Sequence, residues 1–450
     1  MAEKEAESKM FAQGDSAVES VPLKSRVHWM SPATIYAGCE FCIPVIMVGA
    51  GLAASFSMAE ICLILLFGLV VVTWIGDFLC SYLGAMTGRP SSVIGRASFG
   101  HLQARIVIAL SVLIIAGGWW ALQTAVAGNA ISAMLGIDYT TQWWPWAIIT
   151  IVCGLIFAVP SIIGYSSMAW TDYLAVPGGI LILVWAFFLS LRATGWAGIW
   201  AWNPPQTTSW AAAISGVIGL NVAQWVMLSD YSRYCHPRLY DAFMVPSGVV
   251  VVGFVLFIMG GIMSVGIGTS DIVQVMQGLG FPAWAFLILF LAQWTSQLVN
   301  NYSMGLAMCN MFNVTHNRGR AYLTFAATVL GIIVALAGIL NQFMNFLYLT
   351  ALAYPPIASV MVVDYWLIRD KGWKDIPGWN WMATLTIAVG TFLGYYTQYM
   401  HPWGVPAIQT YIVSGALYYG VMYAKAQIAP DAFTPDKWMR ATTGATAQKG

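Results

Sequence analysis

The sequence predicts an all-α membrane protein of about twelve transmembrane helices, built as two five-helix repeats of opposite orientation followed by two C-terminal helices. The first observation is composition: 59% of the 450 residues are hydrophobic and 8% are charged, whereas soluble domains carry about 25% charged residues. The second is a series of apolar runs long enough to cross a bilayer. The third is the placement of the basic residues between these runs, which sets the orientation.

The apolar runs each approach the roughly 20 residues that one membrane span requires. They cover residues 33–56, 60–87, 104–134, 143–163, 171–191, 211–231, 243–267, 281–311, 321–341, 344–368, 381–399 and 406–425. We therefore expect a first repeat at 30–192, a second at 210–369 and two further helices at 381–425. The polar segment 1–29 shows no cleavable signal peptide and predicts a disordered cytoplasmic tail; residues 426–450 predict a second cytoplasmic tail.

Basic residues are confined almost entirely to segments that lie on one side of the membrane if the N-terminus is inside. These inner residues are Lys4, Lys9, Lys24, Arg26, Arg89, Arg96, Arg105, Arg233, Arg238, Arg318, Arg320, Arg369, Lys371, Lys374, Lys425, Lys437, Arg440 and Lys449. Only Arg192 falls on an outer loop. The positive-inside rule then predicts a multi-pass protein of the inner (cytoplasmic) membrane with both termini in the cytoplasm.

Two of the runs contain residues that interrupt helices. Run one places Gly38, Glu40 and Pro44 together near mid-depth, and run six contains two glycines followed by Asn221 and Gln224. The two runs hold equivalent positions in two five-helix repeats, and an odd number of spans inverts the second repeat. Interrupted helices at matching positions point to the binding site of a transporter, although two ordinary kinks are the alternative.

Polar side chains inside the other spans predict what that site binds. Trp119 and Gln123 are four residues apart and share a helix face, so a flat solute stacks on Trp119 while the amides of Gln123, Asn221, Gln297 and Asn301 bind its edge. Packing is the alternative for Trp119 taken alone.

Run eight also carries oxygen ligands for a cation. Thr295 and Ser296 are adjacent, and backbone carbonyls released by the break in run one complete a shell for an alkali cation. The alternative is that both hydroxyls bond to their own helix. Asp77 is interpreted as a packing or gating residue and Asp230 as structural.

Several classes of function are disfavoured. A net charge of +1 gives no reason to expect a nucleic-acid partner, and no obligate protein partner is evident. The seven cysteines lie in or beside apolar runs, so we expect neither a disulfide framework nor a metal site at Cys39 and Cys42. Without a nucleophile–base pair, a metal cluster or a filter repeat, an enzyme and a channel are both disfavoured, and no cofactor is expected.

Five ordered segments resemble the signatures of the nucleobase:cation symporter-1 family, which includes cytosine permeases and the bacterial hydantoin transporter. Residues 95–100 (GRASFG) are similar to its RASFG element, 118–124 (GWWALQT) to GWFGxQT and 291–296 (LAQWTS) to LAQWST. Residues 230–234 (DYSRY) and 364–366 (DYW) are similar to two further motifs.

The resemblance implies the leucine-transporter type fold and Na⁺- or H⁺-coupled uptake of heterocycles. Carried over by position, it implies a Na⁺ site made by backbone carbonyls of Glu40, Ile43 and Ala292 with the hydroxyls of Thr295 and Ser296. It also places Trp119, Gln123, Gln297 and Asn301 around the substrate.

The sequence departs from the family pattern at two positions. Asn221 stands where the family places a second stacking aromatic, so that ring is missing or comes from another residue such as Trp225. Glu40 stands where a small residue is expected, and its carboxylate would tighten cation binding, accept a proton or pair with the substrate.

The expected function is import of a nucleobase or related nitrogen heterocycle across the membrane by alternating access. The solute binds in a pocket within the bilayer, and its import is coupled to Na⁺ or H⁺. The alternative is a carrier of the same fold for an amine, an amino acid or a vitamin precursor such as a thiamine-related pyrimidine, with Glu40 as counter-charge.

Overall fold

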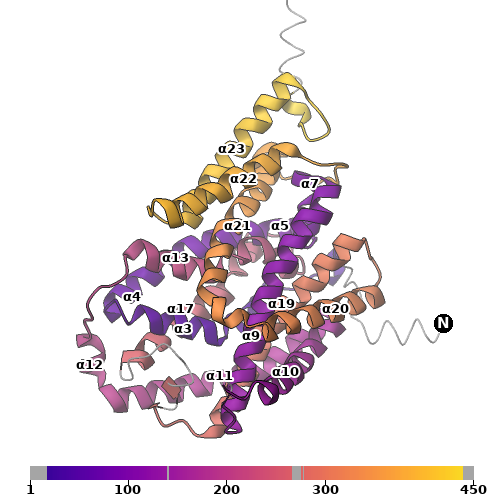
Figure 1. The fold of residues 1–450 in the computed structure, drawn as a ribbon. Helices are drawn as coiled ribbons and strands as arrows, with labels where there is room; N and C mark the ends of the chain where they lie inside the picture. The colour runs from indigo at the N-terminus through magenta and orange to yellow at the C-terminus, as the bar shows by residue number, and fades with distance from the viewer. Residues whose placement is uncertain (1–17, 139–140, 266–274, 277, 439–450) are drawn as a thin grey trace, which may run out of the picture.

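The computed structural model describes residues 18–138, 141–265, 275–276 and 278–438, and this part of the chain is helical (Figure 1). Outside the helices, the pairing found there is one isolated parallel bridge between Val27 and Cys235. Many large apolar side chains face outward, including Leu181 (69% exposed) and Phe392 (64%). Such a surface suits a lipid environment, because soluble monomers rarely expose extended apolar patches.

A helix lies over each of the twelve apolar runs. The N-terminal half contains α2 (Met30–Glu40), α3 (Ile43–Leu52), α4 (Met58–Leu65), α5 (Trp74–Thr87), α6 (Ser91–Ile94), α7 (Arg96–Phe99), α8 (His101–Gln103), α9 (Ala109–Met134), α10 (Trp143–Ile163), α11 (Tyr165–Thr194) and α12 (Trp196–Ala201). The remainder contains α13 (Trp210–Asn221), α14 (Gln224–Met227), α15 (Ser229–Ser232), α16 (Leu239–Met244), α17 (Ser247–Val265), α19 (Ala283–Phe312), α20 (Asn317–Leu336), α21 (Phe343–Val363), α22 (Trp381–Tyr395) and α23 (Pro406–Ile428).

Seven helices in the described residues are long and apolar enough to cross a membrane, and the bent pair α2–α3 adds an eighth. The other runs lie on helices that are shorter, less apolar or only partly described; α22, for example, has 15 residues before it widens into a π-helical turn. The count of twelve spans therefore stays a prediction.

The helices form a bundle around α9 and α19, which pack along each other. The pair α2–α3 lies against α17 and α19, and α22 and α23 pack on α21 at one end of the molecule (Figure 1). The buried apolar core includes Tyr36, Leu65, Trp120, Phe257 and Tyr302.

The first interrupted helix is broken, as the sequence predicts. The axes of α2 and α3 differ by 61°. Phe41 has φ −72° and ψ 70°, and the Cys42 N–H donates to the Glu40 carbonyl at 2.7 Å, which is an inverse γ-turn. Pro44 lies in the first turn of α3, where its missing N–H costs no helical hydrogen bond.

The second interrupted helix is only kinked, so the prediction of two equivalent breaks is wrong for this run. Val222 and Ala223 keep right-handed helical angles between α13 and α14, and Trp210–Ser232 counts as one 23-residue span. The difference is that run six has no proline. The N–H of Trp225 donates to Val222 at 3.1 Å, so the chain tightens by one 3₁₀ turn.

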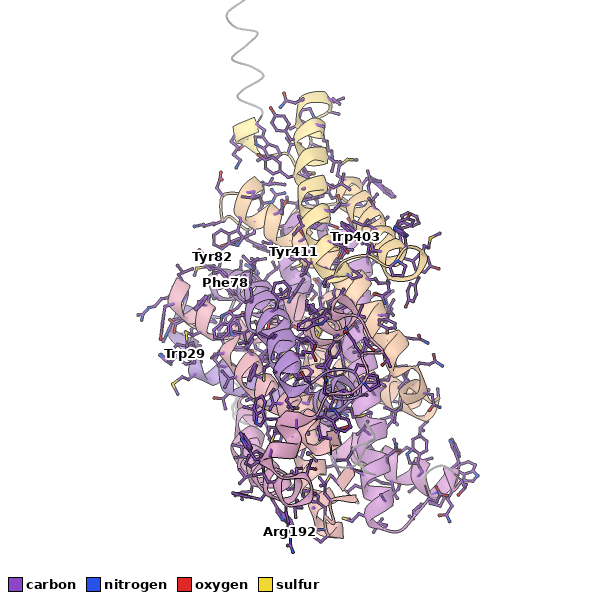
Figure 2. The ribbon with its side chains drawn as sticks, turned by 90° about the vertical axis from the view of Figure 1, so that its left-hand side faces the viewer. Trp29, Phe78, Tyr82, Arg192, Trp403 and Tyr411 are labelled. Carbon is purple, nitrogen blue, oxygen red and sulfur yellow. The ribbon has the colours of Figure 1, made fainter. Side chains whose placement is uncertain are left out.

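The prediction of a disordered tail over 1–29 is also wrong for its second half, while residues 1–17 lie outside the described part. Val21 is 2% exposed, and the Arg26 guanidinium donates to the carbonyl of Val21 at 3.2 Å and to that of Ala85. The apolar side chains of this polar segment bury themselves against the end of α5. Figure 2 shows Trp29, Phe78 and Tyr82 on the same edge of the molecule.

Candidate functional site

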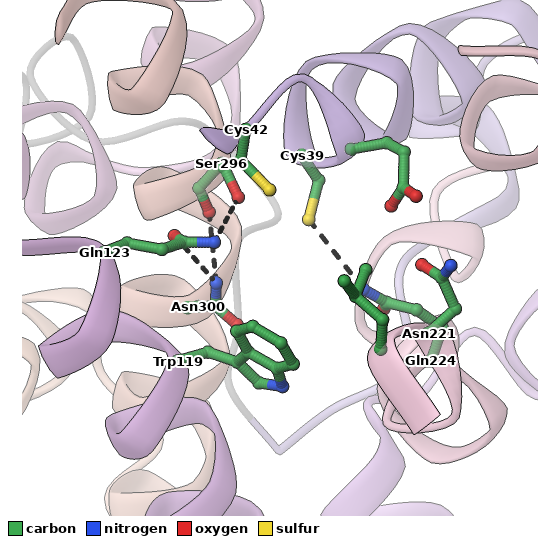
Figure 3. Close-up of a pocket in the computed structure, with 10 residues that line it drawn as sticks. Cys39, Cys42, Trp119, Gln123, Asn221, Gln224, Ser296 and Asn300 are labelled. Carbon is green, nitrogen blue, oxygen red and sulfur yellow. Dashed lines mark hydrogen bonds between the residues drawn. The ribbon is translucent and has the colours of Figure 1, made fainter. Parts of the chain in front are cut away.

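A polar pocket lies where the break between α2 and α3 meets α9, α13–α14 and α19 (Figure 3). Its lining residues are Cys39, Glu40, Cys42, Trp119, Gln123, Leu220, Asn221, Gln224, Ser296 and Asn300. Each of these is at most 8% exposed. The pocket is therefore closed to solvent in this structure, and a solute can enter it only after the helices move.

One wall is a set of amides fixed by hydrogen bonds between α9 and α19. Nε2 of Gln123 donates to the Ser296 hydroxyl at 2.7 Å. Nδ2 of Asn300 donates to Oε1 of Gln123 at 3.4 Å and to the Ser296 carbonyl at 3.2 Å (Figure 3). These bonds hold the Gln123 amide in one orientation before any solute arrives.

Trp119 supplies the aromatic surface of the pocket. Two rings of α21 meet it edge-on, Phe346 at 5.2 Å and Phe343 at 6.4 Å between centroids. Trp225 does not line the pocket, because it packs edge-on against Tyr411 at 5.3 Å. The suggestion that Trp225 supplies a second stacking ring is therefore wrong, and the apolar group added by α13 is Leu220.

The opposite wall carries a carboxylate. In the amide orientation that satisfies both groups, Nδ2 of Asn221 donates to Oε2 of Glu40 at 2.8 Å and to Oε1 at 3.3 Å. Within the residues that the structure describes, no basic side chain forms an ion pair with Glu40. Beside it, Nε2 of Gln224 lies 3.8 Å from the Cys39 sulfur. This wall is rich in acceptors and complements a solute that carries N–H groups.

Two of the predicted cation ligands, Ile43 and Ser296, lie near the joint between α3 and α19. The Ile43 N–H donates to Oε1 of Gln293 at 3.0 Å, which fixes the start of α3 on α19. Ser296 lies at this joint and lines the pocket. The side chains of Ala292 and Thr295 lie outside the described residues, so the predicted Na⁺ shell of Glu40, Ile43, Ala292, Thr295 and Ser296 stays a prediction.

Two predicted substrate ligands on α19 are not brought into the pocket. Nε2 of Gln297 donates to the Trp120 carbonyl at 3.0 Å and to the Thr124 hydroxyl at 2.7 Å. Asn301 donates to Ser161 at 2.8 Å and accepts from Thr328 at 3.0 Å. Both amides join α19 to α9, α10 and α20 in this structure, and their role as substrate ligands stays a prediction.

Sequence reasoning also omitted pocket residues. Asn300 follows Ser296 by one helical turn, so a helical projection phased on Ser296 would have selected it. Cys39, Cys42 and Leu220 gave no signal, because apolar and thiol side chains are ordinary in a membrane helix.

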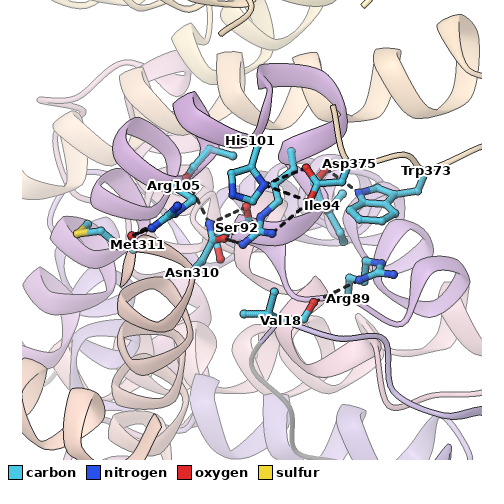
Figure 4. Close-up of polar contacts among 12 residues, drawn as sticks. Val18, Arg89, Ser92, Ile94, His101, Arg105, Asn310, Met311, Trp373 and Asp375 are labelled. Carbon is cyan, nitrogen blue, oxygen red and sulfur yellow. Dashed lines mark hydrogen bonds and ion pairs between the residues drawn. The ribbon is translucent and has the colours of Figure 1, made fainter. Parts of the chain in front are cut away.

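Two of the segments that resemble family signatures, 118–124 and 291–296, contribute Trp119, Gln123 and Ser296 to the pocket, whereas the segment 95–100 belongs to a separate polar network (Figure 4). Nε of Arg96 donates to Oδ1 of Asn310 at 2.9 Å, and its Nη1 lies 3.2 Å from the Asp375 carboxylate. His101 contacts the same carboxylate at 3.1 Å. Burial lowers the pKa of Arg96, and the negative charge of Asp375 opposes that shift. The contacts of Arg96 therefore join α7 to the end of α19 and to the segment before α22.

Asp230 belongs to the same structural network, as the sequence indicates. Its Oδ1 accepts from the Ser91 N–H at 2.7 Å and its Oδ2 from the Ser303 hydroxyl at 2.6 Å. It joins α15 to α6 and α19.

The broken helix, the closed polar pocket and the lipid-facing surface together define a multi-pass membrane transporter. The chain belongs to the family of permeases for cytosine/purines, uracil, thiamine and allantoin, whose model matches residues 21–413. It is a permease rather than an enzyme, and the resemblance to the nucleobase:cation symporter-1 family is confirmed.

Comparisons with individual proteins are consistent with this family membership. The cytosine permease of Escherichia coli K12 is 23% identical over 422 residues, covering 92% of this chain and 94% of the permease. Mhp1, a nucleobase-cation-symport-1 family transporter solved in a closed conformation with bromovinylhydantoin bound, superposes with a TM-score of 0.75 at 18% identity, covering 96% of this chain and 99% of Mhp1. A Na⁺-coupled sialic acid symporter superposes at 0.68 with 14% identity, covering 91% and 92% of the two chains. The leucine-transporter type fold is thereby confirmed.

Proposed function

We propose that this protein is a symporter of the cytoplasmic membrane that imports a nucleobase or related nitrogen heterocycle together with a cation, by alternating access. The observation that carries the proposal is the closed pocket in which the Trp119 ring adjoins an edge of fixed amides, beside the break between α2 and α3. Both termini are proposed to lie in the cytoplasm, following the distribution of basic residues.

The pocket suits a flat ring with alternating C=O and N–H groups. The ring stacks on Trp119, and the edge exchanges hydrogen bonds with Gln123 and Asn300, because an amide both donates and accepts. Glu40 and Asn221 on the facing wall bind exocyclic N–H groups. A closed pocket strengthens each of these contacts by excluding water.

The cation binds at the break between α2 and α3, with ligands from the end of α2, the start of α3 and α19. Glu40, Ile43 and Ala292 contribute carbonyl oxygens, and Thr295 and Ser296 contribute hydroxyls. Hard oxygen ligands of this kind suit Na⁺. Because the shell spans the break and α19, an occupied site favours the closed arrangement of the two segments.

The experiment is uptake of labelled cytosine, and of a panel of other heterocycles, by proteoliposomes containing the purified protein. Base–aromatic stacking is worth about 1–3 kcal/mol by alanine substitution, so Trp119→Ala raises the half-saturating concentration about 10- to 100-fold. Trp119→Phe keeps a ring face and retains most of the affinity. Equal uptake by the wild type and Trp119→Ala, with both inserted normally, would refute the proposed pocket.

A second candidate is a carrier of the same fold for an amine, an amino acid or a vitamin precursor such as a thiamine-related pyrimidine. It is favoured by Glu40, a buried carboxylate whose described partner is the Asn221 amide. A cationic solute would supply the missing counter-charge.

Glu40→Gln separates the two candidates, because it removes the charge and keeps the shape. A neutral heterocycle retains uptake within a few-fold, whereas a cationic solute loses it. If cytosine-like uptake is absent in the wild type while an amine is carried and Glu40→Gln abolishes that transport, the second candidate is correct.

A further inference from the structure

Asp77 is a buried carboxyl that the pocket described above does not use. It lies on α5 and is 0% exposed. Neither of its oxygens has a hydrogen-bond partner among the described residues. A satisfied structural aspartate looks different, as Asp230 shows with one donor on each oxygen. An orphaned buried carboxyl in a membrane protein is a candidate for function.

The helix facing Asp77 also carries orphaned polar atoms. Helix α5 packs on α14, and a Cβ on Gly76 would lie 2.4 Å from Nε1 of Trp225, which places the indole directly against this turn of α5. Nε1 of Trp225 and Oε1 of Gln224 are both buried without a hydrogen-bond partner. One is a donor and the other an acceptor, on consecutive residues.

The ionisable groups around Asp77 do not neutralise it. Glu40 and Cys80 lie within Coulombic range of its carboxyl, and neither supplies a positive charge. The titratable groups on the helices that pack against α5 have partners of their own: Asp230 (Ser91, Ser303), Tyr231 (Val299), Asp241 (Trp29) and Tyr354 (Met227). Among the described residues, no Lys, Arg or His pairs with Asp77.

An ionised carboxylate without a partner is strongly disfavoured in such surroundings, so the group must hold a proton or meet a donor. The protonated and the ionised carboxyl require different hydrogen-bond partners. A protonated Asp77 donates, and Oε1 of Gln224 is a free acceptor; an ionised Asp77 accepts, and Nε1 of Trp225 is a free donor. Neither contact is formed in this structure, so these two groups of α14 can serve the two states only after α5 and α14 shift relative to each other.

We propose that Asp77 is a proton-binding site that is loaded and emptied once in each transport cycle, coupling proton entry to solute entry. This inference rests on the proposed symporter function and names Asp77 as the residue that binds the coupling proton. The step is a protonation equilibrium, in which the carboxylate takes a proton from one side of the membrane and releases it to the other.

Gln224 links this site to the pocket. Its Nε2 contacts Cys39 on the pocket wall, while its Oε1 has no partner. Opening and closing of the pocket around a solute would move α13 and α14 relative to α5, and this movement would decide whether Asp77 contacts Gln224 or Trp225. Solute and proton are then bound in the same conformation.

The test compares the wild type, Asp77→Asn and Asp230→Asn in proteoliposomes, with two readouts. The first is accumulation of labelled heterocycle driven by an inward proton gradient. The second is exchange of internal for external solute without any gradient. Asp77→Asn reduces accumulation to the equilibrium level and retains exchange, because an uncoupled carrier still exchanges its solute. Asp230→Asn, the matched buried aspartate, lowers the amount of folded protein, and the folded fraction still accumulates solute.

The inference is overturned if Asp77→Asn accumulates solute like the wild type, or if folded Asp77→Asn loses exchange together with accumulation. It is also overturned if Glu40→Gln uncouples solute transport from the proton gradient while Asp77→Asn does not. If Asp77→Asn does not fold, an internal pH dye in wild-type vesicles decides, because solute entry without proton entry refutes the site. If Na⁺ alone drives solute transport, the proton site at Asp77 is refuted and the proposed symporter function stands. If no heterocycle is transported at all, the proposed symporter function is refuted.

Discussion

Two adjacent asparagines of α19 have different surroundings although the sequence does not distinguish them. Asn300 lines the pocket beside Gln123 and Ser296. Asn301 is turned away and bonds Ser161 of α10 and Thr328 of α20. The 100° step between consecutive helical residues separates a pocket-lining side chain from a helix-packing one.

Alanine substitution of each asparagine tests this division. Asn300→Ala weakens solute affinity about tenfold, because loss of one partner from a buried hydrogen bond costs about 1–3 kcal/mol. The variant remains stable, since Gln123 still bonds Ser296. The measurement is the half-saturating concentration for uptake alongside a thermal unfolding curve.

Asn301→Ala is the matched control and shows the reverse pattern. It lowers the unfolding temperature and leaves the affinity of the folded protein unchanged. Should Asn301→Ala weaken affinity and Asn300→Ala not, the rotation of α19 in this structure is wrong.

At this scale the sequence predicts pairs within one helix better than it predicts contacts between helices. Trp119 and Gln123 both line the pocket, because their spacing of four is a local property of α9. The four amides Gln293, Gln297, Asn300 and Asn301 look alike in the sequence, and the rotation of α19 in the bundle decides which of them meet a solute. Cys39 and Cys42 enter the pocket only because the chain breaks beside them.

At the scale of the helix, the broken segment is held by direct contact between backbones. A Cβ on Gly260 of α17 would lie 2.1 Å from the Ile46 carbonyl oxygen of α3. Only a residue without a side chain permits this approach. The neighbouring Gly261 is not so confined, since its Cβ would meet Met58 and Ile61 at 3.4–3.5 Å.

Gly260→Ala therefore separates α3 from α17, whereas Gly261→Ala does not. Overpacking of this kind costs about 1–3 kcal/mol, so Gly260→Ala lowers the unfolding temperature and weakens cation-dependent uptake, because Ile43 moves with α3. Gly261→Ala behaves as the wild type in both measurements. Equal stability of the two variants would show that the helices are further apart than the structure has them.

The break in run one and the kink in run six show how far helix interruption follows from residue type. In run one, Gly38 relaxes the helix before the break and Pro44 removes a backbone donor after it, and the chain there bends by 61°. Glycines alone in run six leave the helix nearly continuous. Glycine permits a break without requiring one, and the neighbouring helices decide the outcome.

At the scale of the whole molecule, the pocket is linked to a polar network at one end of the bundle. Arg96 of α7 contacts Asn310 at the end of α19 and Asp375 in the segment before α22 (Figure 4). Helix α19 also carries Ser296 and Asn300 of the pocket. If the pocket opens at that end, the contacts of Arg96 must break, and they would then bias the molecule toward the closed arrangement seen here.

Arg96→Ala is expected to open this end. Hydrogen bonds to charged groups contribute about 1.5–3 kcal/mol each, so their loss shifts the closed–open equilibrium about tenfold or more toward the open form. Cys42 in the pocket, 6% exposed here, reports the change through its rate of labelling by a water-soluble thiol reagent, in a background where the other six cysteines are alanine. The labelling rate rises in Arg96→Ala and falls again when saturating solute holds the pocket closed.

Asp370→Asn is the control, because it removes an exposed ion pair with Lys437 at the same end of the molecule. Such pairs contribute about 0–1 kcal/mol, so labelling of Cys42 stays at the background rate. If Arg96→Ala labels no faster than the background, or Asp370→Asn labels as fast as Arg96→Ala, the buried network does not control access to the pocket. The signature residues near Arg96 would then act only in folding, because their contacts would hold α7, α19 and the segment before α22 together without changing the equilibrium between the closed and open forms.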